Sequence, residues 1–254
     1  MATLIELAGV SKRYGALAAL DAVDLSVQPG AFVALVGGSG SGKTTLLKTI
    51  NGLIRPDDGA VAVAGEDVAS SEPHLLRRRI GYVFQEVGLF PHLTVAENIG
   101  VTPRLLGWDK ARIAARVGEL LALVDLPATV ADRPPAALSG GQRQRVGVAR
   151  ALAAEPKLML MDEPFGALDP VTRDALGADY RALHERLGLT TIMVTHDMAE
   201  AVLLADRIVV LKSGRVLADG APADLLAKSG DPDVRALLEA PKRQAERLRA
   251  RLGA

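Results

Sequence analysis

The sequence contains no cysteine, which excludes disulfide bonds, iron–sulfur ligation and thiol catalysis. Aromatic residues make up only 3% of the chain, and its 30 basic residues are balanced by 30 acidic ones. A chain without net charge has no overall field that would attract nucleic acid or an anionic membrane. We therefore expect specific binding to come from local motifs, and we expect no nucleic-acid partner.

Long apolar runs are also missing. No uncharged stretch approaches the roughly 20 residues that a membrane-spanning helix needs. The N-terminus, Met1 to Leu7, has no basic segment leading into a long apolar one, so we expect no signal peptide. Hydrophobic residues nevertheless make up 49% of the 254 residues, which is enough for a large core. We expect one cytoplasmic domain with lobes.

A glycine-rich segment, residues 37–45, directly follows the apolar run 32–36 and matches the G-x-x-x-x-G-K-[ST] phosphate-binding loop without a mismatch. Glycine lets the backbone curl so that successive N–H groups point at phosphate oxygens, and the helix expected at 44–50 points its positive end at the same place. The alternative is a surface turn that matches by chance, which the flanking strand and helix disfavour. The residues expected around the phosphates are Gly37, Gly38, Ser39, Gly40, Ser41, Gly42, Lys43, Thr44 and Thr45.

Within this loop we expect Lys43 to contact the β- and γ-phosphates and the Thr44 hydroxyl to bind Mg²⁺. Such a site needs an acidic partner at a strand end. The apolar residues 158–161 are followed by Asp162 and Glu163, so Asp162 would reach the metal through water and Glu163 would polarise the attacking water. The alternative is a pair of solvated carboxylates, but exposed acids rarely follow four buried apolar residues without cause.

A second anion site is predicted where residues 138–142, Leu-Ser-Gly-Gly-Gln, open a helix expected at 140–154. Gly140 and Gly141 allow close backbone approach, Ser139 offers a hydroxyl, and the helix N-terminus favours negative charge. This site lies about a hundred residues from the first. We interpret it as serving a nucleotide held by another copy of the chain.

Apolar runs and helical periodicities alternate along most of the chain, which indicates an α/β domain around a largely parallel sheet. A helical insertion is expected from about 94 to 154, and the tail is expected as three short helical pieces broken at 230–232 and at Pro241. The expected strands are residues 4–8, 20–27, 32–36, 60–64, 80–84, 158–161, 190–194, 208–211 and 216–218. Residues 11–15 are expected as an excursion between the first two strands, and the other main helices are expected at 74–79, 170–187 and 198–204.

The order of these motifs resembles that of ATP-binding cassette (ABC) ATPases over about residues 4–220. The resemblance implies a P-loop NTPase (RecA-like) α/β core with an antiparallel β subdomain and an inserted α-helical subdomain at about 86–155. The nucleotide-binding domain would then span residues 1–220, and residues 221–254 would form a C-terminal helical tail. Its basic segment 242–252 is interpreted as solvated, with a docking helix or a linker remnant as alternatives.

The resemblance also implies roles for single residues. Tyr14 would stack on adenine, Gln85 would contact Mg²⁺ and sense the membrane partner, and His196 would contact the γ-phosphate. From the residues alone, a lone tyrosine such as Tyr14 is more often ordinary packing, and a single histidine beside a strand end, such as His196, is usually structural. In this family ATP lies between the phosphate loop of one copy and Ser139, Gly140, Gly141 and Gln142 of the other, with residues 167–169 crossing the interface. The resemblance thus assigns catalysis to Glu163, His196 and Gln85, and Mg²⁺ binding to Thr44, Gln85 and Asp162, partly through water.

Residues 86–99 are similar to the segment of prokaryotic importers that receives a helix of the membrane subunit. Residues 102–108 and 163–174 are similar to cassettes for quaternary amines such as glycine betaine, carnitine and choline, although many cassettes carry Ser where this chain has Gly166. The resemblance implies an ATP-hydrolysing homodimer at the cytoplasmic face of the membrane. It would bind permease subunits through the groove near Gln85–Asn98, and indirectly a substrate-binding protein.

Two alternatives stay open: an importer of another small polar solute, or a cassette outside transport. The second would normally show a long coiled-coil insertion or two tandem cassettes, and neither is present in this sequence. Several relatives in the quaternary-amine group continue into regulatory modules, and this sequence ends at Ala254. The resemblance therefore does not carry regulation by ionic strength through such modules over to this chain.

Overall fold

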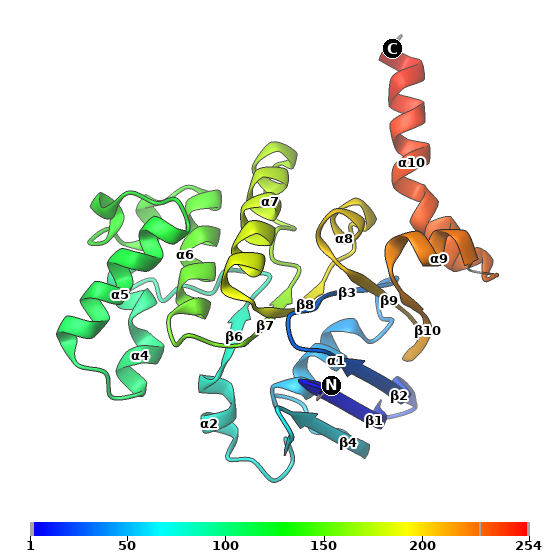
Figure 1. The fold of residues 1–254 in the computed structure, drawn as a ribbon, viewed down its shortest axis with the longest axis horizontal. Coiled ribbons are helices and arrows are strands. Elements are labelled where there is room, and N and C mark those ends of the chain that lie inside the picture. The colour runs from blue at the N-terminus through cyan, green and yellow to red at the C-terminus, as the bar shows by residue number, and fades with distance from the viewer. Residues whose placement is uncertain (1–2, 229, 253–254) are drawn as a thin grey trace.

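The fold is built on a six-stranded sheet, seen in a computed structural model that describes residues 3–228 and 230–252. The strand order is β10-β9-β3-β8-β7-β6, and all neighbours are parallel except the last hairpin, β9–β10 (Figure 1). Parallel strands aligned in this way bring their carboxyl ends to one edge of the sheet. The strands are β3 (Phe32–Val36), β6 (Ile80–Val83), β7 (Leu158–Asp162), β8 (Thr190–Val194), β9 (Arg207–Lys212) and β10 (Arg215–Gly220).

A second, antiparallel sheet has the order β2-β1-β4-β5. Its strands are β1 (Ile5–Tyr14), β2 (Leu17–Val27), β4 (Asp58–Val63) and β5 (Glu66–Asp67). The predicted excursion at residues 11–15 is wrong, because β1 continues to Tyr14 and turns at Gly15, whose φ is +59°. Polar residues stay in the strand here because the side chain of Asp57 binds both Lys12 Nζ and the Arg13 N–H, each at 2.7 Å.

The helix after the phosphate loop, α1 (Lys43–Ile50), lies between the two sheets (Figure 1). Side chains along β3 point alternately to the two faces of the sheet and so contribute to two hydrophobic clusters. Val33 and Leu35 pack on the face that α1 covers. The cluster on the opposite face contains Phe32, Ala34 and Val36. That opposite face is covered by α7 (Pro170–Leu187) and α8 (Met198–Leu204). The fully apolar β3 is therefore buried on both faces, as parallel strands usually are.

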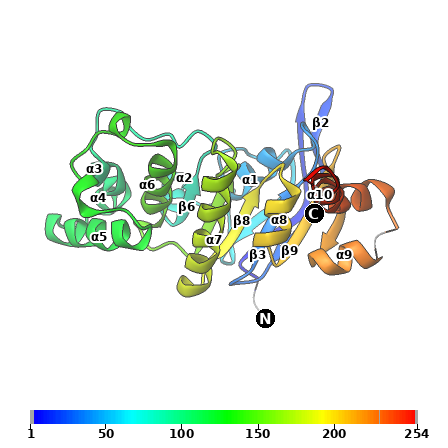
Figure 2. The ribbon, with the colours of Figure 1, turned by 90° about the horizontal axis from the view of Figure 1, so that it is seen from above.

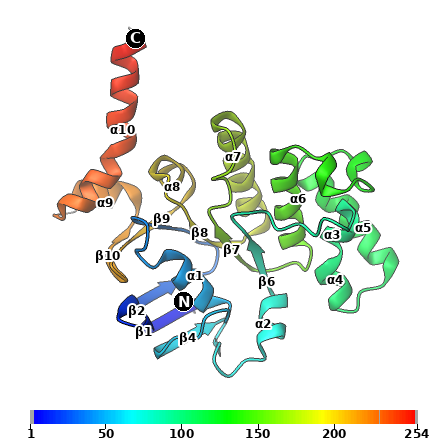
Figure 3. The ribbon, with the colours of Figure 1, turned by 180° about the vertical axis from the view of Figure 1, so that it is seen from behind.

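The predicted helical insertion gathers at one end of the molecule, beyond the β6 edge of the sheet, and the tail lies at the other (Figures 1 and 3). Polar side chains cap three helices of the insertion at their N-termini. Thr94 and Ser139 form capping boxes at the starts of α3 and α6, and Asp109 caps α5 as predicted. The elements between β5 and β7, apart from β6, are α2 (Pro73–Arg78), α3 (Val95–Ile99), α4 (Val101–Leu105), α5 (Lys110–Leu123), the single 3₁₀ turns η1 (Ala128–Val130) and η2 (Pro135–Ala137), and α6 (Gly140–Leu152).

The tail contains α9 (Pro222–Lys228) and α10 (Pro232–Leu252). Helix α10 projects away from the sheet (Figure 1) and is therefore seen end-on in Figure 2. The predicted break at Pro241 is wrong, since α10 runs through it. Buried Val234 and Leu238 anchor the preceding turns, and Arg243 donates to the carbonyl of Ala236 at 2.7 Å, which links the turns on either side of Pro241. Within residues 3–228 and 230–252, no helix is both long and apolar enough to cross a membrane.

Candidate functional site

The phosphate loop connects the end of β3 to the start of α1, and its glycines are required by its shape. Gly37, Gly40 and Gly42 have φ values of +148°, +75° and +104°, which L side chains rarely adopt. A Cβ on Gly37 would lie 2.2 Å from the carbonyl oxygen of Leu211, and one on Gly42 would lie 2.3 Å from that of Ala19. The loop backbone therefore passes very close to two strands of different sheets, β9 at Leu211 and β2 at Ala19.

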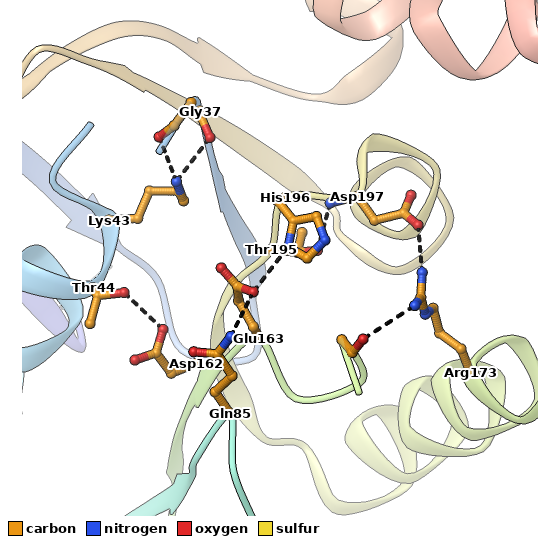
Figure 4. Close-up of polar contacts among 12 residues, drawn as sticks. Gly37, Lys43, Thr44, Gln85, Asp162, Glu163, Arg173, Thr195, His196 and Asp197 are labelled. Carbon is orange, nitrogen blue, oxygen red and sulfur yellow. Dashed lines mark hydrogen bonds and ion pairs between the residues drawn. The ribbon is translucent and has the colours of Figure 1, made fainter. Parts of the chain in front are cut away.

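Lys43 begins α1 and folds back into this curl (Figure 4). Its Nζ donates to the carbonyls of Gly37 and Gly38, both at 2.9 Å, and lies 3.4 Å from the Ser41 hydroxyl. Burial lowers the pKa of Lys43, while the nearby carboxylates of Glu163 and Asp162 act in the opposite sense. The ammonium is thus held where phosphate oxygens could replace the carbonyls as its partners.

The next residue, Thr44, donates its hydroxyl hydrogen to Oδ1 of Asp162 across 3.0 Å (Figure 4). Asp162 ends β7 and is only 8% exposed, and burial raises the pKa of its carboxyl. Hydroxyl and carboxylate oxygens are suitable Mg²⁺ ligands, and Mg²⁺ commonly takes its remaining ligands from phosphates and water. The described residues contain no group of three or more acidic or histidine side chains that could hold a metal.

Glu163 lies at the centre of the predicted catalytic residues. Its Oε2 accepts a hydrogen bond from Nε2 of Gln85 at 3.2 Å and lies 3.0 Å from Nδ1 of His196 (Figure 4). The three residues follow β6, β7 and β8, so the sheet brings their side chains to one edge. Glu163 has a φ of +46°, an uncommon and strained conformation for a residue other than glycine.

A cleft of about 510 Å³ contains most of the predicted nucleotide site. Tyr14 lies on its wall with half its surface exposed, and Lys12 Nζ is 5.7 Å from the centre of the tyrosine ring. The structure therefore brings the predicted base-stacking residue, residues 39–45 of the phosphate loop and two predicted catalytic residues, Glu163 and His196, to one cavity. The lining residues are Tyr14, Leu17, Ala19, Ser39, Gly40, Ser41, Gly42, Lys43, Thr44, Thr45, Glu163 and His196.

The second predicted anion site does not join this cleft within one chain. Ser139 and Gln142 form the capping box of α6: Oγ of Ser139 accepts from the Gln142 N–H at 3.2 Å, and Oε1 of Gln142 accepts from the Ser139 N–H at 3.0 Å. This arrangement leaves the Ser139 hydroxyl hydrogen available to donate to an anion. Gly141 is needed for packing, since a Cβ would lie 2.9 Å from Thr172 of α7, whereas Gly140 leaves more space.

Two side chains, those of Asn98 and Arg150, hold the backbone of the segment that follows Gln85. Asn98 is fully buried, donates to the carbonyls of Phe90, Leu93 and Thr94, and accepts from the Phe90 N–H. Arg150 of α6 donates to the carbonyls of Val87 and Gly88 at 2.8 and 2.7 Å. No local pattern in the sequence shows these contacts, because each depends on the path of the loop.

Beside this segment lies a mainly apolar groove of about 470 Å³ between α3, α4 and α5. Charged side chains at its rim include Glu97, Arg104 and Lys110. The remaining lining residues are Ala96, Ile113, Ala114, Val117, Gly118, Leu121, Ala128 and Ala131.

Comparisons with known proteins agree with this architecture. The sequence model of the ABC transporter family matches residues 20–166, more than half of the chain. The glycine betaine/carnitine/choline transport ATP-binding protein OpuCA of Bacillus subtilis is 50% identical over 88% of this chain. The sulfate/thiosulfate import ATP-binding protein CysA of Bradyrhizobium diazoefficiens is 49% identical over 87% of it. The chain spans 59% and 64% of the lengths of these two relatives.

Among solved structures, a dimeric post-hydrolysis state of an ATP-binding cassette bound to ADP and Pi superimposes with a TM-score of 0.76 at 34% sequence identity. The match covers 85% of this chain and 98% of the cassette. The predicted fold class is therefore confirmed: an α/β P-loop cassette with an antiparallel sheet and a helical insertion. The chain belongs to the ABC transporter family.

Proposed function

We propose that this chain is the ATP-hydrolysing subunit of an importer. The observation that carries the proposal is the contact of one Glu163 oxygen with both Gln85 and His196. Glu163 and His196 line the same cleft as residues 39–45 of the phosphate loop. A carboxylate held by two polar side chains beside a phosphate site is suited to orient and deprotonate a water molecule.

In this mechanism the protein mainly positions groups and stabilises charge. The backbone N–H groups of the loop and Lys43 bind the phosphates, and Glu163 accepts a proton from the attacking water. His196, which lines the same cleft, would donate to the γ-phosphate. Thr44 and Gln85, with Asp162 through water, would hold Mg²⁺, and a bound Mg²⁺ would neutralise charge that develops on the phosphate oxygens.

A second copy of the chain would complete the site. The hydroxyl hydrogen of Ser139 is available to an anion, and a helix begins directly after this residue. None of residues 139–142 lines the cleft of its own chain. The related cassette with ADP and Pi is dimeric, which supports a head-to-tail pair in which these residues face the phosphates held by the partner. Residues 167–169 would cross that interface.

Permease subunits would bind through the segment Gln85–Asn98 and the adjoining apolar groove. Asn98 and Arg150 hold the backbone of this segment, so a helix that presses on it could transmit motion to Gln85 and Glu163. Such an assembly would place the chain at the cytoplasmic face of the membrane, with a substrate-binding protein contacting the permease. Within the chain, residues 1–220 would form the nucleotide-binding domain, with the helical subdomain at about 86–155, and residues 221–254 a tail.

For the cargo we propose a quaternary amine such as glycine betaine, carnitine or choline. Relatives named for transport of these compounds reach 49% to 50% identity. A second candidate is another small polar solute, because a relative named for sulfate/thiosulfate import is 49% identical. The cassette does not contact the cargo in this mechanism, so its residues cannot separate the two candidates.

Two substitutions test the ATPase. Glu163→Gln should bind ATP, hydrolyse it very slowly and trap a dimer, which gel filtration with ATP would detect. Glu155→Gln is the matched control, since Glu155 also has positive φ but is exposed and remote from the cleft. Ser139→Arg should abolish hydrolysis while the isolated chain still binds nucleotide. Near-normal turnover of Glu163→Gln, or loss of binding by Ser139→Arg, would contradict the proposal.

The cargo is tested by uptake of labelled glycine betaine at raised osmolarity in cells that lack the chain. Wild type should restore uptake and Glu163→Gln should not. If uptake never depends on the chain, the second candidate replaces the first, and labelled sulfate is the next probe.

A further inference from the structure

One guanidinium joins the two segments that carry Glu163 and His196. Arg173 lies in the first turns of α7, and its Nη1 donates to Oδ2 of Asp197 at 3.1 Å (Figure 4). Its Nη2 donates to the carbonyls of Leu168 and Gly166, at 3.2 and 3.4 Å. The side chains of Arg173 and Asp197 are 27% and 33% exposed, so this contact is partly shielded from water.

The first of these segments, residues 163–169, begins at the proposed base. Its internal bonds run from the Gly166 N–H to the carbonyl of Glu163 and from the Leu168 N–H to that of Phe165. Asp169 then caps α7 by accepting the Thr172 N–H at 3.0 Å. The segment is therefore a compact turn whose position relative to α7 is fixed at its end by Asp169 and along its length by Arg173.

The second segment carries His196 directly before Asp197. Oδ1 of Asp197 accepts the N–H groups of Ala199 and Glu200 at 2.9 and 3.2 Å and so caps α8. Its other oxygen is left for Arg173. The two oxygens of Asp197 thus have separate partners. Oδ1 caps α8, and Oδ2 binds Arg173, which in turn binds the segment 163–169.

We propose that Arg173 is a positioning residue that sets the geometry between Glu163 and His196 and thereby the rate of hydrolysis, an inference that rests on the function proposed above. The side chains of Glu163 and His196 lie 3.0 Å apart although the two residues follow different strands, β7 and β8. Arg173 binds Asp197, which adjoins His196, and two carbonyls of the turn that begins at Glu163. A planar guanidinium can serve acceptors on two sides at once, whereas a lysine ammonium acts as a point charge and would hold only one segment.

The experiment compares Arg173→Lys and Arg173→Gln with the same changes at Arg181. Arg181 is a matched control, because it lies on the same helix with the same 27% side-chain exposure. It also joins a carboxylate and a backbone carbonyl from outside its helix, those of Asp206 and Leu204, each at 2.8 Å. It contacts neither segment of the site. Steady-state ATP hydrolysis, nucleotide affinity and thermal unfolding are measured on the full chain.

Both Arg173 variants are expected to lower kcat by about tenfold or more while KM for ATP changes by less than about threefold, as for loss of orientation without loss of binding. The Arg181 variants should keep kcat within about twofold of wild type even where stability falls to the same extent. Unchanged kcat in the Arg173 variants would overturn the inference. So would a fall in kcat that only follows the loss of stability seen at Arg181.

A double-mutant cycle supplies the second readout. Asp197→Asn keeps a good helix cap but loses the charge that Arg173 binds. If the two residues act as one connection, the double variant Arg173→Gln/Asp197→Asn should lose no more kcat than the more impaired single variant; fully multiplicative losses would overturn the inference.

Failure of the proposed function is recognised separately. A wild-type chain that does not hydrolyse ATP, or a Glu163→Gln chain that does so normally, would reject the ATPase mechanism and this inference with it. An active wild type, an inactive Glu163→Gln and fully active Arg173 variants would reject this inference alone.

Discussion

The hydroxyl of Thr44 and the carboxylate of Asp162 meet at 3.0 Å, which joins the start of α1 to the end of β7. Burial raises the pKa of Asp162, so the folded chain favours the protonated carboxyl relative to the unfolded chain. Stability is consequently lost as the pH rises from the ordinary pKa of an aspartate through the raised one. In the absence of nucleotide, the ionised carboxylate is a destabilising element of the fold.

Asp162→Asn should therefore raise the free energy of unfolding of the nucleotide-free chain at neutral pH, by about 1 kcal/mol, which is typical when a functional charge is removed. The amide oxygen can still accept from Thr44. The same change should remove the Mg²⁺-dependent part of the stabilisation by ATP, measured by thermal unfolding with and without the metal. Asp174→Asn, at an exposed position of α7, is the control and should change neither quantity. Lower stability of Asp162→Asn without nucleotide would contradict this explanation.

Two glycines of one loop should respond differently to the same substitution. Gly42→Ala introduces a Cβ 2.3 Å from the carbonyl oxygen of Ala19 at a φ of +104°, whereas nothing lies within 4 Å of a Cβ on Gly38. Gly42→Ala should cost about 2 kcal/mol or more of unfolding free energy, and Gly38→Ala should stay within about 1 kcal/mol of wild type. Urea denaturation measures both. Equal losses would mean that the loop relaxes and that the strand contact is not required.

The elements that the sequence predicts best are those with clear local signals for where they start and stop. The helix at 170–187 agrees residue for residue, because Asp169 caps it, Pro170 suits its first turn, and Gly188 ends it with a φ of +58°. The strand at 190–194 and the helix at 198–204 also agree, the latter being capped by Asp197. In each case the signals that start and stop the element lie within the element or next to it.

The errors occur where distant contacts override local preference. Polar residues 11–13 stay in β1 because Asp57 binds two of them, and α10 passes Pro241 because Val234 and Leu238 anchor its first turns. The same limit applies to the site. The order of motifs predicts the residues that converge on Glu163. The hydrogen bonds that Arg173, Asn98 and Arg150 donate to backbone carbonyls are not predicted, because every residue has a carbonyl and the sequence does not show which one a side chain reaches. The roles of the site residues stay predictions.

Strain at Glu163 leads to another expectation. Its φ of +46° is better suited to asparagine, which tolerates the left-handed region several-fold more often than most residues. Glu163→Asn should therefore stabilise the fold by about 1 kcal/mol while hydrolysis is lost, whereas Glu163→Gln should lose hydrolysis without that gain. Glu155→Asn, at a φ of +56°, is the matched control and should gain stability with hydrolysis unchanged. If Glu163→Asn is no more stable than Glu163→Gln, the backbone at this position carries no strain.

A buried histidine away from the cleft should make stability depend on pH. Nε2 of His184 lies 3.2 Å from the carbonyl oxygen of Gly30, which can only accept, so Nε2 carries a hydrogen. Nδ1 lies 3.0 Å from the Thr191 hydroxyl, which can donate to it when the ring is neutral. Burial, assisted by Arg181, lowers the pKa of His184. Because the unfolded chain then binds a proton more readily, stability should fall as the pH drops below the ordinary pKa of histidine towards the lowered one. Urea denaturation between about pH 7.5 and 5.5, the range around that ordinary pKa, should show this slope in wild type and in His74→Gln, whose histidine is exposed, and a shallower slope in His184→Gln. An unchanged slope in His184→Gln would assign the pH dependence to other groups.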